Sequence, residues 1–164
     1  MQAVISDAGP VIALSRIGLL AVLPQSFNRL LITETVRDEL ISAGGFVGQS
    51  EIQAALQTWL LVEKVKPEQL SLANASLDPG ERSSIALCMQ LPGSLLIVDD
   101  MQGRKEAQAL GLNFTGLVGV LLRAHQRGLL THLQPAFDSL KKQNYFLSDR
   151  LIVQVLRQTG ELPA

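Results

Sequence analysis

Apolar residues along the chain occur in short continuous runs, which alternate with longer stretches where apolar and polar positions recur at helical spacing. Short runs of this kind are typical of strands buried on both faces, and they cover 3–6, 30–32 and 95–98. Residues 61–65 are expected to form a short strand or extended piece, and 113–115 a short strand. The periodic stretches predict helices at 10–18, 33–42, 49–60, 78–91, 101–110, 117–127, 134–143 and 148–158. Residues 68–77 are polar and irregular, and we expect a loop there. The alternation predicts an α/β fold whose mostly parallel sheet is covered on both faces.

Local signals support several of these helix ends. Pro10 suits the first turn of the first helix, because its missing N–H is not needed there. Thr33 is a good N-cap for the second helix, and Gly44-Gly45 ends it. Asp78 followed by Pro79 gives an N-cap and a first helical residue.

Length and composition set limits on the kind of protein. A chain of 164 residues predicts one domain, 1–164, with the C-terminal helices at about 134–158 packing on it. An apolar fraction of 47% excludes a disordered chain. With 14 basic and 15 acidic residues the net charge is −1, so no global positive field holds nucleic acid. A nucleic-acid enzyme of this composition needs a local basic rim, a bound cation or basic side chains from a partner.

Cysteine use and hydropathy indicate the compartment. Cys88 is the single cysteine, which excludes an internal disulfide and a cysteine zinc site and fits a reducing cytoplasm. Its position on an apolar helix face predicts a core residue. No apolar run approaches the ~20 residues of a membrane span. Met1-Gln2-Ala3 leads directly into the first predicted strand, so we expect no signal peptide and a cytoplasmic protein.

Two predicted strands end in acids, Asp7 after the first and Asp99-Asp100 after the fourth. Ligands of such sheets bind outside the carboxyl ends of the strands. Carboxylates grouped there repel one another unless a divalent cation or a shared proton neutralises them, and oxygen ligands suit Mg²⁺ or Mn²⁺. A simpler interpretation, in which these aspartates are turn residues or helix N-caps, stays open.

Two glutamates are further candidates. Glu39 falls at the edge of the inward face of the second predicted helix, whereas Glu34 and Asp38 point to solvent. Glu39 therefore either extends outward into solvent or lines a cleft. Glu81 stands three residues after Asp78, which is the capping-box spacing, so spacing alone favours a structural role in which Glu81 reaches back.

Four stretches, in this order, resemble the motifs of PIN-domain proteins. Residues 4–14 resemble the opening of these proteins, and 36–40, 80–82 and 96–104 resemble the later motifs of one bacterial branch. The resemblance continues through 116–122 and the tail around 146–149. This branch is similar to the toxin nucleases of type II toxin–antitoxin operons.

The resemblance implies a Rossmann-like three-layer α/β/α sandwich with four acids that bind Mg²⁺ or Mn²⁺. Carried over position by position, these catalytic and metal-binding acids are Asp7, Glu39, Glu81 and Asp100, with Asp99 as an adjacent metal-ligand candidate. Two positions depart from the pattern. Gly9 stands where many PIN domains have a hydroxyl or amide side chain, and the third acid is Glu81 rather than Asp.

The activity implied is metal-dependent endoribonuclease cleavage of RNA. The implied partners are an RNA substrate, a small antitoxin protein docked around Val36, Leu40, Ile52 and Leu56, and a second copy in a homodimer. Two alternatives are a PIN-like module that binds RNA or protein without catalysis, and a phosphatase with Asp7 as nucleophile. The phosphatase lacks the acid that such enzymes commonly carry two residues later, because Gly9 is there.

Three basic or titratable residues lie outside the acids. Arg104 lies one helical turn past Asp100, where it either contacts a substrate phosphate or pairs with Asp100. His125 and His132 lie far in sequence from every acid, and we expect surface residues rather than ligands.

Overall fold

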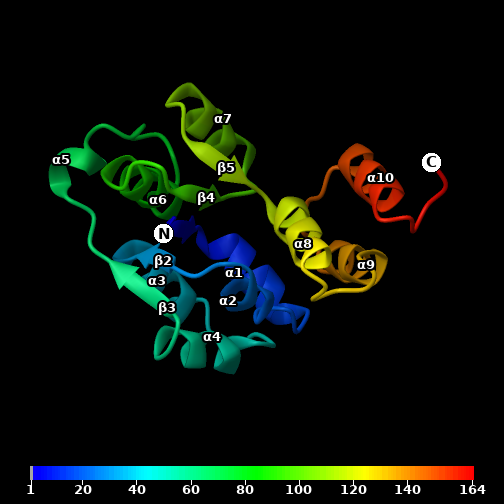
Figure 1. Cartoon of the computed structure of the whole chain (residues 1–164). Helices are drawn as coiled ribbons and strands as arrows, with labels where there is room; N and C mark the ends of the chain where they lie inside the picture. Colours follow the sequence, from blue (N-terminus) through cyan, green and yellow to red (C-terminus); the bar gives the residue numbers. More distant parts are fainter. Residues whose placement is uncertain (1) are drawn as a thin grey trace.

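The computed structural model of the chain describes residues 2–164 (Figure 1). Within this range five strands pair in parallel in one sheet, with the order β3-β2-β1-β4-β5. The strands are β1 Val4–Ser6, β2 Leu30–Thr33, β3 Leu60–Glu63, β4 Leu95–Ile97 and β5 Asn113–Thr115. All five overlap the segments where strands are predicted, which confirms the parallel α/β sheet.

Helices connect and cover the strands. They are α1 Ala8–Arg16, α2 Val22–Ser26, α3 Glu34–Ser42, α4 Gln49–Leu56, α5 Pro67–Leu70, α6 Pro79–Gln90, α7 Met101–Ala109, α8 Leu117–Gln126, α9 Gln134–Lys142 and α10 Asp149–Gln158. Thr33 caps α3 as predicted, since its side chain accepts a hydrogen bond from Val36 N at 3.1 Å.

Both faces of the sheet are buried. In β1, Val4 packs into an apolar cluster formed with α1, α3, α4 and the C-terminal helices, whereas Ile5 packs into a second cluster with α6 and α7. In β2, Leu31 joins the second cluster while Leu30 and Ile32 join the first. This alternation is the period-two geometry of a strand, and the helices on either side make the α/β/α arrangement.

Three segments differ from the prediction. The helix at 49–60 ends at Leu56, because Leu60 pairs with Leu30 as the start of β3. The loop at 68–77 begins with the short helix α5, which Pro67 starts. Residues 22–26 form α2, a single short helix that the apolar pattern did not indicate.

The order of the strands directs attention to one place in the sheet. From β1 the chain moves to β2 and β3 on one side, and β4 and β5 are added on the other. The direction therefore reverses between β1 and β4, and in open α/β sheets ligands bind at such a switch point. The two strand ends are joined there by a hydrogen bond from Asp7 N to Ile97 O at 3.1 Å.

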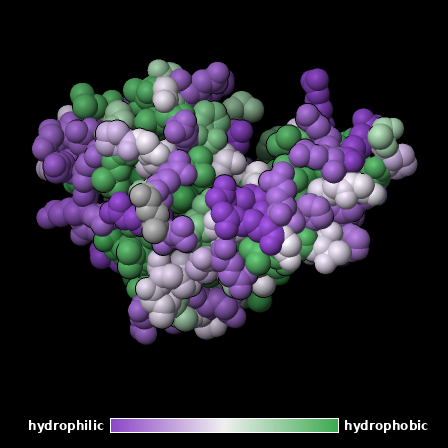
Figure 2. All heavy atoms as spheres, viewed as in Figure 1, coloured by the Kyte–Doolittle hydropathy of each residue, from purple (hydrophilic) through white to green (hydrophobic). Residues whose placement is uncertain are grey.

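Helices α8, α9 and α10 follow the last strand and lie to one side of the sheet (Figure 1). Phe137 of α9 and Ile152 and Val155 of α10 belong to the same apolar cluster as Val4 of β1. In Figure 2 these helices project as a lobe whose visible surface is largely hydrophilic. None of the helices formed by residues 2–164 has both the length and the apolar character needed to cross a bilayer.

Candidate active site

Five acids lie at the carboxyl edge of the sheet around the switch point. Asp7 follows β1, Asp100 follows β4, and Glu39 comes from α3, which follows β2. Helix α6 precedes β4 and runs back against the strands, so its first residues reach the same edge. We call Asp7, Glu39, Asp78, Glu81 and Asp100 the acid group, because each contributes to the electrostatic environment of others in the set.

Asp7 is the most buried member of the acid group. It occupies the N-cap position of α1, yet its side chain makes no capping hydrogen bond. Burial raises the pKa of its carboxyl to about 7, with further increases from the charges of Glu39, Asp78 and Asp100, against a smaller lowering by the Ala8 amide. The interpretation of Asp7 as a simple helix cap therefore has no support in the geometry.

Glu81 faces the same group from the first turn of α6. Burial raises the pKa of its carboxyl to about 8, and the charges of Asp7 and Asp100 together with a hydrogen bond to Asp100 raise it further. Of the predicted capping box, the structure shows the N-cap formed by Asp78 but not the return contact from Glu81. Asp78 accepts from Gly80 N at 2.9 Å, but Glu81 makes no bond back to Asp78.

Glu39 is held beside α6 by a buried link between the two helices. Thr33 Oγ1, at the start of α3, lies 2.7 Å from Ser83 Oγ of α6. Burial raises the pKa of Glu39, as does the charge of Asp78, while the Gly80 amide lowers it. A Cβ added at Gly80 would displace the Glu39 carboxylate, so glycine at this position lets that carboxylate lie directly against the start of α6.

Asp78 is a member that sequence reasoning missed. The sequence predicts it only as the N-cap of α6. In the structure its charge raises the pKa values of Asp7, Glu39 and Glu81. A signal was present in the sequence, because Asp78 is an acid placed three residues from Glu81 at the same helix start.

Asp100 is exposed and caps α7. Its Oδ2 accepts hydrogen bonds from Gln102 N at 2.9 Å and Gly103 N at 3.1 Å. Only one of its two oxygens takes part, so the other stays available toward Glu81 and Asp7. Asp100 is therefore both the N-cap of α7 and a member of the acid group.

Asp99 is used differently from its neighbour. Its carboxylate accepts hydrogen bonds from Leu117 N, 3.1 Å from Oδ2, and from the Tyr145 hydroxyl. Burial raises its pKa, and Tyr145, Leu117 and the nearby Arg104 lower it, with no contribution from the acid group. We call Asp99, Arg104, Leu117 and Tyr145 the Asp99 anchor. Tyr145 is a second residue that sequence reasoning missed.

Arg104 belongs to this anchor, so the alternative in which it pairs with Asp100 is wrong, whereas its contact with a substrate phosphate stays a prediction. Its Nη1 lies 3.9 Å from Asp99 Oδ1 and donates to Val98 O at 3.3 Å. Its guanidinium also lies 5.1 Å from the centre of the Phe114 ring. These contacts draw the side chain back over β4 and β5, away from the helix surface on which Asp100 was expected to meet it.

The remaining candidates lie outside the acid group. His125 Nδ1 lies 2.9 Å from Leu130 O, and exposed His132 is 3.9 Å from Glu161. Cys88 is buried, and burial raises the pKa of its thiol to about 12, which makes it unreactive.

The donors of the acid group suit a hard divalent cation, because all of them are carboxylate oxygens. Burial and mutual repulsion have already raised the pKa of Asp7 and Glu81 toward neutrality, and a cation would relieve that repulsion. The carboxylates are not yet close enough together to coordinate one ion, however. Among residues 2–164, no three His, Cys, Asp or Glu side chains are already arranged so that they could hold a metal ion.

Comparison with known proteins identifies the fold. Residues 3–161 match the family DUF3368, described as a PIN domain. A solved structure of a PilT N-terminus domain protein from the hyperthermophilic archaeon Sulfolobus solfataricus P2 is similar, with a TM-score of 0.54 and 25% sequence identity. The similarity covers 74% of this chain and 91% of the archaeal one. No curated protein sequence matches the chain.

The chain therefore belongs to the PIN-domain family. The fold is usually a nuclease fold, PIN domains are generally hydrolases, and they typically use divalent metal ions. These general properties agree with a group of acids at the carboxyl edge of the sheet.

Proposed function

We propose that the protein is a Mg²⁺- or Mn²⁺-dependent endoribonuclease that hydrolyses RNA phosphodiester bonds, and that it is the toxin of a type II toxin–antitoxin pair. The observation that supports this most is the pair of acids Asp7 and Glu81, whose pKa values are raised to about 7 and 8. Perturbed carboxyls of this kind gather at functional sites.

In this proposal Asp7 and Asp100 are the principal metal ligands. Glu39 and Glu81 bind the metal directly or through water, and Asp78 adds negative charge at the rim. A bound cation supplies Lewis acidity toward the phosphate and lowers the pKa of an attacking water. The raised pKa values of Asp7 and Glu81 mean that metal binding would compete with protons at these two carboxyls.

The function is tested with purified protein and single-stranded RNA. We expect Mn²⁺-dependent cleavage that leaves 5′-phosphate ends, and complete loss of cleavage in EDTA. Mn²⁺ should also raise the melting temperature of the parent by mass action, and Asp7→Asn should abolish that rise. Cleavage that persists in EDTA, or equal stabilisation of Asp7→Asn, would contradict the metal mechanism.

The toxin role has a separate test. Expression of the chain alone should slow growth, and co-expression of a small neighbouring reading frame should restore it.

The residues expected to form the antitoxin docking surface are wrong, because Val36, Leu40 and Ile52 are at most 1% exposed and fill the core. Ile41 and Val47 are the exposed apolar side chains of that region, at 57% and 79%. The predicted homodimer is tested by light scattering on the purified protein.

A second function, binding of RNA or protein without catalysis, is favoured by one observation. Among residues 2–164, the side chains of the acid group are not arranged so that three of them could hold one metal ion. Folded protein that binds RNA but does not cleave it with either Mg²⁺ or Mn²⁺ would decide for this function.

A further inference from the structure

Charge is distributed unevenly along the chain. Residues 117–164, which form α8, α9 and α10, carry six Lys or Arg and three Asp or Glu, for a net charge of +3 with His neutral. Residues 1–116 carry eight basic and twelve acidic side chains, for a net charge of −4. The acid group lies in the negative part, whereas the excess of positive charge lies in the C-terminal helices.

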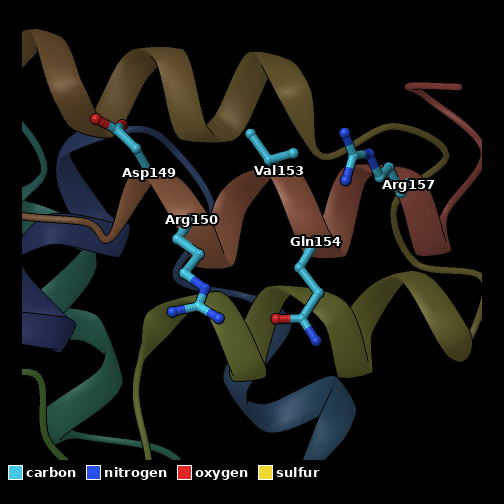
Figure 3. A pocket seen from close by; sticks show the side chains of 5 residues that line it. All are labelled: Asp149, Arg150, Val153, Gln154 and Arg157. Atoms are coloured by element: carbon cyan, nitrogen blue, oxygen red, sulfur yellow. The ribbon is translucent and has the colours of Figure 1, made fainter. Parts of the chain in front are cut away.

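Part of this positive charge lines a shallow hollow of about 580 Å³ on α10. Figure 3 shows its residues in two rows on the helix, with Arg150 and Gln154 pointing one way and Asp149, Val153 and Arg157 pointing the other. The one acid among them is already paired, since Lys141 Nζ lies 2.6 Å from Asp149 Oδ1. The free charges of the hollow are therefore two guanidinium groups.

The hollow begins near the strand end that carries Asp99 and Asp100, because Tyr145, a few residues before α10, contacts Asp99. Tyr145 is fixed to Asp99, directly beside Asp100, and α10 begins only four residues later at Asp149. Five residues of fully extended chain span at most ~18 Å, so Arg150 lies within that distance of Tyr145. Phe146 stands between the two places with 77% of its surface exposed.

We propose that Phe146 and the outer face of α10 form a binding surface for single-stranded nucleic acid that extends from the acid group. The proposal rests on the nuclease function proposed above. Exposed aromatic rings stack on bases, and guanidinium groups bind phosphates. Arg150 and Arg157 are separated by about 10 Å along the helix, which is the rise of roughly three stacked nucleotides. The surface supplies the local positive charge that a chain of net charge −1 otherwise lacks.

The test is the binding of a fluorescently labelled single-stranded RNA of about 12 nucleotides, measured in EDTA at several salt concentrations. The variants are Phe146→Ala and the double variant Arg150→Gln/Arg157→Gln. Arg127→Gln is the matched control, since it removes an exposed arginine of the same region outside the hollow. All variants are first checked for an unchanged melting temperature.

The double variant should bind more weakly, and the slope of log affinity against log salt should fall by about 1.4, or ~0.7 for each lost phosphate contact. Phe146→Ala should weaken binding by ~10-fold without a change of slope. Affinity and slope equal to those of Arg127→Gln in the double variant would overturn the proposal and leave the face to a protein partner.

Failure of this proposal and failure of the nuclease function give different results. Binding that depends on Arg150 and Arg157 without any Mn²⁺-dependent cleavage supports the surface and contradicts the nuclease. Cleavage of the RNA by a double variant that binds as tightly as the control supports the nuclease and overturns the surface.

Discussion

Asp99 and Asp100 are adjacent in sequence at the end of one strand, yet they belong to two chemically different regions. In the Asp99 anchor the carboxylate is enclosed by an amide N–H, a hydroxyl and a guanidinium. In the acid group Asp100 faces other carboxylates, whose pKa values are raised. An acid whose lone pairs are already taken by protein donors stabilises the fold. Asp100 also accepts two amide hydrogen bonds, but only through Oδ2, so its other oxygen remains available for a cation.

The largest expected effect separates the two aspartates by activity. Asp100→Asn should lower Mn²⁺-dependent cleavage at least ~100-fold, because it removes a proposed metal ligand. Asp99→Asn should keep most of the activity, because Asp99 contributes hydrogen bonds rather than a ligand. Initial rates of RNA cleavage at saturating Mn²⁺ measure both, with His125→Ala as a control expected to behave as the parent. The opposite order of the two variants would make Asp99 the ligand.

The second effect reverses the order when stability is measured instead. Asp99→Ala should lower the free energy of unfolding by about 2–4 kcal/mol, since it leaves the Leu117 N–H and the largely buried Tyr145 hydroxyl without their acceptor. Asp100→Ala should cost only ~1 kcal/mol, the typical loss of a helix cap. Urea unfolding at neutral pH in EDTA gives both values. Equal losses would show that the Asp99 anchor does not stabilise the fold.

The sequence located the sheet and most of the acid group because those signals are local. The apolar run before Asp7 predicted a strand end, and the helix cap at Thr33 placed Glu39 one turn and a half later at the border of the core. The Asp99 anchor had no such signal. Tyr145 and Asp99 are separated by 46 residues, and their contact depends on how α8 and α9 pack. The alternative in which Arg104 pairs with Asp100 failed for a related reason, since the observed partner, Asp99, lies outside the helix of Arg104.

The third effect is a dependence of stability on pH that arises from Asp7 and Glu81 of the acid group. Asp7 and Glu81 have folded-state pKa values of about 7 and 8, above their ordinary values of 3.8 and 4.5. The folded state therefore binds more protons than the unfolded state between these limits, and stability falls as the pH rises from about 4 to about 8.

Urea unfolding of metal-free protein across this range should show that fall, of ~2–4 kcal/mol, most of it from the more buried Asp7 and less from the more solvated Glu81. Asp7→Asn should flatten it, and saturating Mn²⁺ should reduce it in the parent. Stability that rises over the same range in EDTA would contradict the raised pKa values.

The smallest effect concerns the most exposed member of the Asp99 anchor. Arg104→Gln removes an ion pair at 3.9 Å in which the arginine side chain is 39% exposed, so the loss of stability should stay below about 1 kcal/mol. Thermal unfolding beside Asp99→Ala measures it. A loss as large as that of Asp99→Ala would mean that the guanidinium, rather than the two hydrogen bonds, neutralises Asp99.

The hydroxyl that binds Asp99 belongs to the single tyrosine of the chain, and the single tryptophan, Trp59, lies against the apolar cluster on one face of the sheet. The two optical chromophores therefore stand in different regions, and each can be recorded without a label. Burial and the charge of Asp99 hold the pKa of Tyr145 well above its usual range. Its ultraviolet absorbance should accordingly resist alkaline titration until the anchor opens. An alkaline titration followed by tyrosine absorbance thus reports when the C-terminal lobe detaches from Asp99, while tryptophan emission reports on the sheet.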